Sequence, residues 1–189
     1  MKLKLLMWNY LASKRMEMAK NHIDSNIHKS LLDIGCGKDM SFIKSLNGME
    51  KIGLDLQNGS KVVKRLNLDN NSFDYVIMLA TIEHLEYPNE ILKECSRVLK
   101  SGGFLIITTP KDTIFLHTIE KMFFSENLKI YPNLHFFDKE SLGIISSECF
   151  SLEKYKTFEF GLNQLFVFQK TPIDEKDKLQ IGNPMELLH

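Results

Sequence analysis

The sequence predicts an α/β fold in which helices cover both faces of a mostly parallel β-sheet. Short apolar runs typical of buried strands alternate along the chain with longer segments of helical periodicity. The run at residues 31–34 ends at Gly35 and Gly37, as a parallel strand does where it stops at a tight turn. The next run ends in an acid, Asp55. A glycine turn followed by a carboxylate after the next strand is typical of nucleotide-binding sheets.

The first half of the chain supplies a helix and the opening strands of this sheet. Apolar residues three and four positions apart predict a helix at residues 3–22. The pattern then favours a strand at residues 30–34, a helix at 40–47, a strand at 51–55 and a weak strand at 62–63. The exposed N–H groups of the glycine turn and of the following helix start form a polar cradle suited to a ligand.

The second half continues the alternation of strands and helices. A strand is expected at residues 74–79, and a helix follows at 88–99, where Pro88 suits the first turn. Residues 101–103 contain two glycines and end this helix. The apolar run at 104–108 is then typical of a strand buried on both faces.

The pattern changes near the C-terminal end. Asp138 is expected to cap a helix that runs to about residue 147. Residues 151–159 and 162–170 follow as two strands, close enough in sequence to form an antiparallel hairpin at the sheet edge.

Length and composition favour one domain, which we place at residues 1–170. Of the 189 residues 43% are hydrophobic, a normal level for a chain with one full core. Residues 1–25 form its N-terminal helix. The aromatic segment 111–137 is expected to act as a lid that also binds substrate, and residues 171–189 are expected to form a flexible tail.

Charge and cysteine content narrow the function classes. Lys and Arg together number 24, as do Asp and Glu, so net charge offers no reason to expect a nucleic-acid partner. No run approaches the roughly 20 apolar residues that cross a bilayer. The three cysteines are scattered, without metal-ligand or disulfide spacing. These observations predict a cytoplasmic protein and leave its oligomeric state open.

The glycine motif alone leaves the ligand open. A dinucleotide fingerprint needs a third glycine where this chain has Met40, which disfavours a nicotinamide oxidoreductase. A phosphate-binding loop is also disfavoured, because neither Ser nor Thr follows Lys38. Asp33, an acid beside the cradle, suits a zwitterionic amino-acid group better than a pyrophosphate.

A series of motifs in the second half decides between these alternatives. Residues 72–77, 83–85, Pro88 and 97–103 closely resemble class I S-adenosylmethionine-dependent methyltransferases of the small-molecule type, and are similar to quinone-pathway O-methyltransferases. With the glycine turn, the resemblance covers about residues 30–110, and it extends more weakly to about residue 170. It implies a Rossmann-like, seven-stranded, mostly parallel sheet with the cofactor lying across the C-terminal ends of its first strands.

The resemblance implies a role for each residue of the cofactor site. Asp33 reaches the amino group of S-adenosylmethionine, Asp55 takes the ribose hydroxyls, and Leu56 packs on adenine. Leu79 offers its backbone near the methionyl part. The glycine turn that passes under this part consists of Gly35, Cys36 and Gly37.

A basic residue on the N-terminal helix completes the site that the resemblance implies. The quinone-pathway relatives carry an Arg before strand one that pairs with the cofactor carboxylate. Arg15 lies 20 residues before Gly35, at a similar spacing. Solvation at the surface is the alternative interpretation of Arg15.

The chain departs from the family pattern in three places. Asp39 replaces the third glycine of the first motif. The acid that often contacts adenine has no clean match, so we expect Asn67 and Leu68 to supply backbone contacts instead. Ala80 replaces the first acid of the Glu-x-x-Glu-His motif through which some relatives bind a divalent metal, so no metal is predicted.

These observations predict methyl transfer to an oxygen or nitrogen of a small-molecule acceptor, with S-adenosylhomocysteine as the product. An acceptor that must lose a proton favours a histidine near neutral pH. His84 and His135 are the preferred candidates, and His117 is a weaker one because it fits a helical stretch. The alternative is a protein that binds S-adenosylmethionine without catalysis, as a regulatory partner of an active enzyme.

Overall fold

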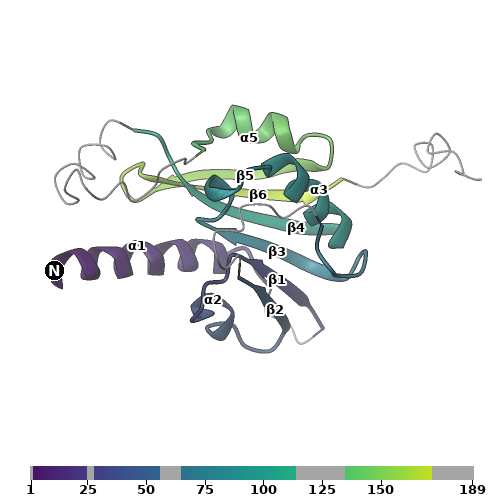
Figure 1. The fold of residues 1–189 in the computed structure, drawn as a ribbon, viewed down its shortest axis with the longest axis horizontal. Helices are drawn as coiled ribbons and strands as arrows, with labels where there is room; N and C mark the ends of the chain where they lie inside the picture. Colours follow the sequence, from purple (N-terminus) through teal and green to yellow (C-terminus); the bar gives the residue numbers. More distant parts are fainter. Residues whose placement is uncertain (1, 25–27, 56–64, 114–134, 172–189) are drawn as a thin grey trace, which may run out of the picture.

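The computed structural model describes residues 2–24, 28–55, 65–113 and 135–171 (Figure 1). Within these ranges, the strands form one six-stranded sheet with the order β2-β1-β3-β4-β6-β5. The expected α/β class with a mostly parallel sheet is confirmed. The described sheet has six strands where seven are predicted, and the weak strand at residues 62–63 lies outside the described ranges.

Four strands are parallel, and a hairpin closes one edge of the sheet. The parallel strands are β1 (Ser30–Ile34), β2 (Glu50–Leu54), β3 (Phe73–Leu79) and β4 (Leu99–Pro110). The hairpin strands are β5 (Phe150–Phe158) and β6 (Asn163–Lys170). β6 pairs antiparallel with both β4 and β5, which confirms the predicted edge hairpin.

Helices cover both faces of this sheet (Figure 1). They are α1 (Lys2–Lys20), α2 (Ser41–Lys44), the short 3₁₀ helix η2 (Ile82–His84), α3 (Pro88–Val98) and α5 (Lys139–Ser146). Successive strand side chains point to opposite faces, so β1 contributes Leu32 and Ile34 to the core beneath α3 and α5. Leu31 points the other way, into the core beneath α1 and α2.

Local sequence explains where two of these helices begin. Pro88 occupies the first turn of α3, where a missing N–H removes no helical hydrogen bond. Asp138 caps α5 as predicted, because its carboxylate accepts a hydrogen bond from the Ser141 N–H at 2.7 Å. The Ser141 hydroxyl accepts one from the Asp138 N–H at 3.0 Å, so each residue satisfies a free donor of the other.

Three predicted elements differ in extent. β4 begins at Leu99 instead of residue 104, because its first residues also pair with β3. The helix expected at 40–47 is reduced to the four residues of α2. The predicted apolar stripe of α1 is not buried throughout: Leu6 is 64% and Tyr10 is 54% exposed, whereas Ala19 is fully buried. Only the C-terminal part of α1 therefore packs on the sheet.

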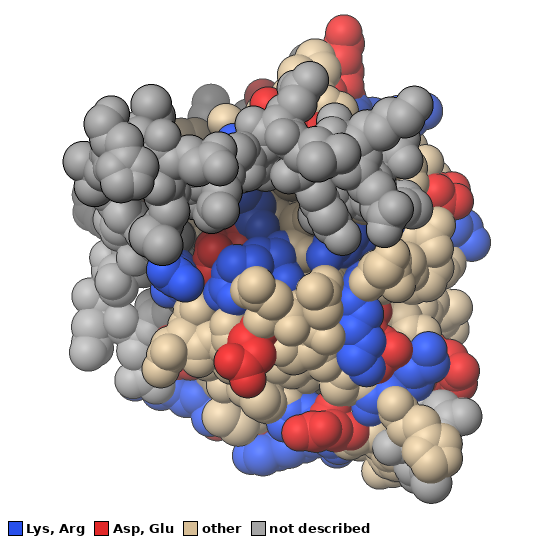
Figure 2. Space-filling view, turned by 90° about the vertical axis from the view of Figure 1, so that its right-hand side faces the viewer, with Lys and Arg blue, Asp and Glu red and all other residues tan. Residues whose placement is uncertain are grey.

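Charged side chains of both signs are interspersed on the face shown in Figure 2. This arrangement agrees with the equal numbers of basic and acidic residues in the whole chain. Among the helices of the described residues, none combines the length and apolar character needed to cross a membrane.

Candidate cofactor site and active site

The turn after β1 is built around one glycine. Gly35 has a φ of +81°, a conformation that residues with a side chain rarely adopt, and a Cβ there would lie 2.3 Å from Oγ1 of Thr81. The N–H groups of Gly35 and Cys36 donate to the Leu54 carbonyl at 2.7 and 3.2 Å. The turn is thereby held between the ends of β1, β2 and β3.

A hollow of about 180 Å³ opens beside this turn. Five residues that the sequence predicts for the cofactor lie around it: Arg15, Asp33, Gly35, Cys36 and Leu79. The other residues that line it are Ala12, Met16, Ser41 and Phe42. The tertiary structure therefore brings α1, the turn after β1 and the end of β3 to one place, which we call the cofactor hollow.

Asp33 is the buried acid that lines the cofactor hollow. It is only 2% exposed, and this burial raises the pKa of its carboxyl group to about 7. A buried carboxyl group in this state favours a ligand that brings a positive charge or hydrogen-bond donors. An amino-acid ammonium group meets that requirement.

Cys36 and Asp55 lie next to Asp33. Burial, followed by the charges of Asp33 and Asp55, raises the pKa of the Cys36 thiol. The thiol is therefore neutral near pH 7 and unsuited to act as a nucleophile. Asp55 directly follows β2 and is half-buried, so its carboxylate remains accessible at the same edge of the sheet.

Four other predicted cofactor residues lie elsewhere or outside the described ranges. Gly37 is exposed, with a φ of +65°, and a Cβ there would contact nothing within 4 Å. Leu56 lies outside the described residues. Asn67 and Leu68 line a second hollow, of about 660 Å³, and the structure does not bring them to the cofactor hollow.

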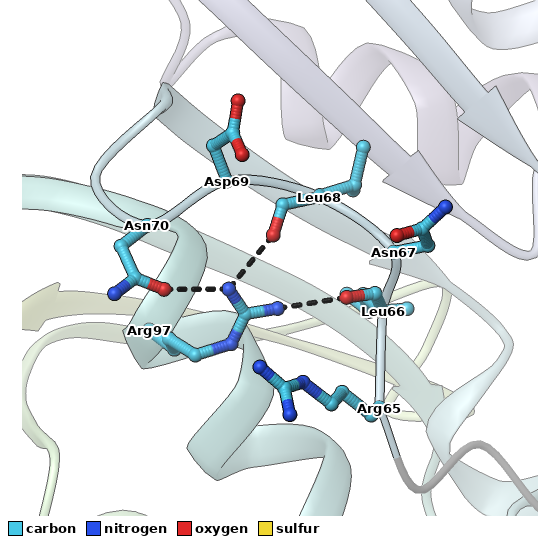
Figure 3. A pocket seen from close by; sticks show the side chains of 7 residues that line it. All are labelled: Arg65, Leu66, Asn67, Leu68, Asp69, Asn70 and Arg97. Carbon is cyan, nitrogen blue, oxygen red and sulfur yellow. Dashed lines mark hydrogen bonds between the residues drawn. The ribbon is translucent and has the colours of Figure 1, made fainter.

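The second hollow is organised by Arg97, whose guanidinium group points at the backbone of the chain before β3 (Figure 3). Nη1 donates to the Leu68 carbonyl at 2.8 Å and to Oδ1 of Asn70 at 2.7 Å, and Nη2 donates to the Leu66 carbonyl at 2.9 Å. The Leu66 and Leu68 carbonyls thus already accept hydrogen bonds from Arg97. Leu68 also borders a hollow with Ser30, which opens β1, so it lies toward the amino ends of the strands.

The two histidines predicted as proton acceptors both lie close to Glu83 in the chain or in space. His84 ends η2, directly after β3, and its side chain is half-buried. His135 is exposed, and its backbone N–H donates to the Glu83 carbonyl at 2.9 Å. The rest of the predicted lid, with His117, lies largely outside the described residues.

Glu83, which precedes His84 and whose carbonyl binds the His135 N–H, is a functional candidate that the sequence analysis did not assign. Its side chain is 2% exposed, and burial raises its pKa to about 7. Its own backbone N–H, the nearby Thr109 hydroxyl and the charge of Arg15 act in the opposite direction. The available signal was an acid four residues after the end of a buried strand and next to an apolar residue, Ile82.

The described residues fit the predicted cofactor. The hollow is lined by a buried carboxyl group, a cationic side chain and a turn that admits no Cβ, and these residues would hold an amino-acid moiety. For metals, no group of three or more His, Cys, Asp or Glu side chains suited to hold an ion occurs within the described part of the chain.

Comparisons with known proteins show which family and fold this chain resembles. Residues 32–107 match a protein family described as "Methyltransferase domain". The ubiquinone biosynthesis O-methyltransferase of Idiomarina loihiensis is 31% identical to this chain over 116 residues, which are 50% of this chain and 48% of that protein. The chain spans about half the length of the curated relatives it matches.

Two crystal structures show the same fold. One is a protein of Pyrococcus horikoshii, with a TM-score of 0.69 and 18% identity, and the match covers 87% of this chain and 92% of that chain. The other is an S-adenosylmethionine-dependent methyltransferase of Archaeoglobus fulgidus, with a TM-score of 0.64 and 19% identity, covering 85% and 94%. Residues 32–107 therefore match a methyltransferase domain in sequence, and the described residues have the fold of S-adenosylmethionine-dependent methyltransferases.

Proposed function

We propose that this protein transfers a methyl group from S-adenosylmethionine to an oxygen or nitrogen of a small-molecule acceptor. One observation carries the proposal: α1, β1 and β3 bring Arg15, Asp33, Gly35 and Leu79 around one hollow at the carboxyl ends of the parallel strands. In open α/β sheets this edge is where ligands bind. The position of the residues, more than the identity of any one of them, supports binding of the cofactor here.

Several residues in and beside the cofactor hollow have a task in this proposal. Asp33 attracts the ammonium group of the cofactor, because a positive charge favours the ionised form of this buried carboxyl group. Arg15 binds the cofactor carboxylate as a hydrogen-bonded ion pair. Asp55 accepts hydrogen bonds from the ribose hydroxyls, and the backbone of Gly35 allows the ligand to approach the turn closely.

The bound cofactor supplies an activated methyl group, so the protein has to orient the acceptor and keep water away from the reaction. An oxygen acceptor is favoured over nitrogen by the names of the curated relatives, which are O-methyltransferases of ubiquinone biosynthesis. The match to the relative of Idiomarina loihiensis covers 50% of this chain. We further propose that the protein acts in the cytoplasm.

The proposal is tested by calorimetry with S-adenosylhomocysteine, followed by assays of methyl transfer. We expect the wild type to bind S-adenosylhomocysteine in the micromolar range. Asp55→Ala should weaken binding about tenfold or more, because a hydrogen bond to a charged group contributes about 1.5–3 kcal/mol. Asp69→Ala, an exposed acid at the opposite edge, is the matched control and should leave the affinity unchanged.

Transfer is then measured as the conversion of S-adenosylmethionine to S-adenosylhomocysteine with a panel of phenols, alcohols and amines. Binding without turnover on any acceptor would favour the non-catalytic alternative. An Asp55→Ala protein that binds as tightly as the wild type would remove the proposed cofactor site.

A further inference from the structure

Most of the large apolar side chains that remain exposed lie at one edge of this protein. The described part of the chain has six of them, and all but one lie where the parallel strands end. Met40 follows β1, Tyr87 follows β3, and Phe160 lies in the turn between β5 and β6. Leu6 and Tyr10 belong to the part of α1 that extends beyond the sheet at this edge (Figure 1). Single exposed apolar residues are normal, but a group of them at one edge indicates a contact surface.

Three of these side chains lie close to one another. Leu6, Tyr10 and Lys14 follow at intervals of four residues, so they form one row along the exposed side of α1. The charge of Lys14 acts on Glu159, the residue directly before Phe160. The hairpin tip with Phe160 therefore lies near the end of this row. We call Leu6, Tyr10 and Phe160 the apolar rim.

Phe160 occupies a position that is unfavourable for its side chain in two ways. The side chain is 96% exposed, so a large aromatic ring faces water. Its φ of +56° lies in the left-handed region, which bulky residues rarely adopt. Glycine or asparagine would form this turn without exposing a ring. A strained and exposed aromatic residue therefore points to a partner that contacts this tip.

The charge of α1 indicates what kind of partner the apolar rim contacts. The helix contains five basic residues and one acid, which are Lys2, Lys4, Lys14, Arg15 and Lys20 against Glu17. Its first turn has two of these lysines and no acid. Positive charge at the amino end of a helix opposes the helix dipole, so the two lysines do not serve the stability of α1. They favour an anionic partner instead.

The strand that leads to the hairpin tip adds to this positive charge. Lys154 and Lys156 are exposed on β5, and Phe160 follows soon after. Burial, followed by the charges of these two lysines, lowers the pKa of His22, which lies just after the end of α1. The two lysines of β5 are thus on the side of the sheet that α1 covers.

We infer that the apolar rim docks this protein on the surface of an anionic lipid bilayer. Aromatic and leucine side chains are favoured at the depth of the lipid headgroups, and nearby Lys and Arg residues are attracted by an anionic surface. The members of the apolar rim protrude separately, from a helix and from a hairpin tip. A fluid headgroup layer accommodates such separate points better than the fixed surface of a folded protein does. Docking of this kind needs no membrane-spanning helix.

The docked surface lies close to the cofactor hollow without being part of it. Ala12, Arg15 and Met16 of α1 line the hollow, so docking through the preceding residues of α1 holds the hollow near the lipid surface. No member of the apolar rim lines the hollow. The inference therefore goes beyond the proposed function and does not depend on it.

The test measures how the full chain sediments with vesicles of phosphatidylcholine, alone or mixed with phosphatidylglycerol in a ratio of about 2:1. We expect the wild type to bind the mixed vesicles about tenfold or more tightly than the neutral ones, and to lose most of this difference in about 0.5 M salt. Trp8 is the only tryptophan of the chain and belongs to α1. Its fluorescence should shift to shorter wavelength on the mixed vesicles, because lipid displaces water around α1.

Two kinds of variant separate the apolar contribution from the charge. Phe160→Asn suits the left-handed turn and removes the ring, so it should weaken binding to the mixed vesicles about fivefold or more. Ile144→Asn on α5 is its matched control, because Ile144 is exposed to the same extent as Leu6 but lies outside the apolar rim.

The charge is tested by replacing Lys2 and Lys4 together with glutamine, which should weaken binding about tenfold. Lys93→Gln, on the exposed side of α3, is the control and should bind as the wild type does. Urea unfolding checks that each variant is as stable as the wild type.

Equal binding of the wild type to both kinds of vesicle would overturn the inference, as would unchanged binding in Phe160→Asn. Self-association of the wild type without lipid, abolished by Phe160→Asn, would overturn it in favour of a second copy of this chain as the partner. The affinity for S-adenosylhomocysteine is measured separately and should stay unchanged in every variant. A wild type that binds the mixed vesicles as expected but no S-adenosylhomocysteine would overturn the proposed function alone.

Discussion

Asp33 shows how the position of one residue sets the behaviour of a site. The side chain is short and lies at the end of a strand buried on both faces, so it cannot reach bulk water. Its pKa of about 7 means that the empty protein holds it protonated below neutral pH. A carboxyl group in this state has to lose its proton when an ammonium group binds beside it.

The affinity for S-adenosylhomocysteine should therefore depend on pH. Below pH 7 binding releases the proton of Asp33, so the affinity should rise about tenfold per pH unit as pH rises and level off above pH 7. Arg15 and Cys36 also line this hollow, and the charge of Asp55 acts on Cys36 from beside it. Burial raises the pKa of the Cys36 thiol, so this thiol does not titrate in the range of Asp33. Calorimetry from pH 5.5 to 8.5 measures the effect.

Asp33→Asn provides the control for this pH dependence. The amide of this variant does not titrate. The variant should therefore bind S-adenosylhomocysteine more weakly than the wild type above pH 7, and its affinity should be nearly constant below pH 7. An equally steep pH dependence in Asp33→Asn would show that another group is responsible.

Gly35 and Gly37 form a matched pair for testing the turn. Gly35→Ala should cost several kcal/mol and abolish cofactor binding, because its Cβ would overlap Oγ1 of Thr81 and the positive φ would add strain of about 1–2 kcal/mol. Gly37→Ala introduces only the strain, since its Cβ would meet open space. Urea unfolding and calorimetry measure the two effects, and equal losses in both variants would contradict this account of the turn.

At the scale of elements, α3 holds the chain segment before β3 in place. Arg97, in the last turn of α3, binds the carbonyls of Leu66 and Leu68, and Glu94 accepts from the Leu66 N–H at 2.7 Å. Glu94 and Arg97 also bond to each other at 2.8 Å. Two residues on one turn of α3 thus supply hydrogen-bond partners for backbone groups of the segment before β3, which is not part of the sheet.

Arg97→Ala should lower the free energy of unfolding by about 2–3 kcal/mol, because it removes several charge-assisted hydrogen bonds and leaves two carbonyls without their donors. The rate of hydrogen exchange should increase more in residues 65–70 than in the strands of the sheet. Lys93→Ala is the control on the same helix, since its ion pair with Glu148 is exposed and should contribute less than about 0.5 kcal/mol. A similar loss in both variants would argue against this function of Arg97.

At the scale of the whole molecule, Asp74 joins three strands at the edge opposite the cofactor hollow. Its carboxylate accepts hydrogen bonds from the backbone and the hydroxyl of Ser30 and pairs with Lys29 and Lys100. Burial raises the pKa of Asp74, but Lys100, Ser30 and Lys29 outweigh that effect and hold the pKa at about 2. These contacts stabilise the folded protein only while Asp74 is ionised.

The stability that Asp74 contributes should therefore be present above pH 4 and be lost as pH falls toward 2. An unfolded aspartate takes up its proton near pH 4, before the folded one does, so acid favours unfolding in this window. Asp74→Asn should be less stable than the wild type at pH 7, and the difference should vanish near pH 2. Urea unfolding at pH 2, 4 and 7 measures this, with Asp69→Asn as a control, and a difference that persists at pH 2 would exclude the mechanism.

Prediction from the sequence succeeded where the signal is local. The glycine turn, the cap at Asp138 and the edge hairpin each depend on residues close together in the chain, and the structure has all three. It was less accurate for α1, because periodicity alone does not show how far a helix extends beyond the sheet. The contacts expected of Asn67 and Leu68 depend on where a loop runs, and the spacing of residues does not determine that.

The amino-acid sequence by itself determined the order of strands and helices, the turn at Gly35 and the acids at the ends of the first two strands, because alternation, glycine conformation and strand ends are properties of neighbouring residues. Only the tertiary structure decided that Arg15 reaches the cofactor hollow and that Glu159, at the hairpin tip, lies near Lys14 of α1. Those residues are far apart in the chain. They are brought together by the pairing of β4 with β6 and by the packing of α1 on the sheet, which no local pattern encodes.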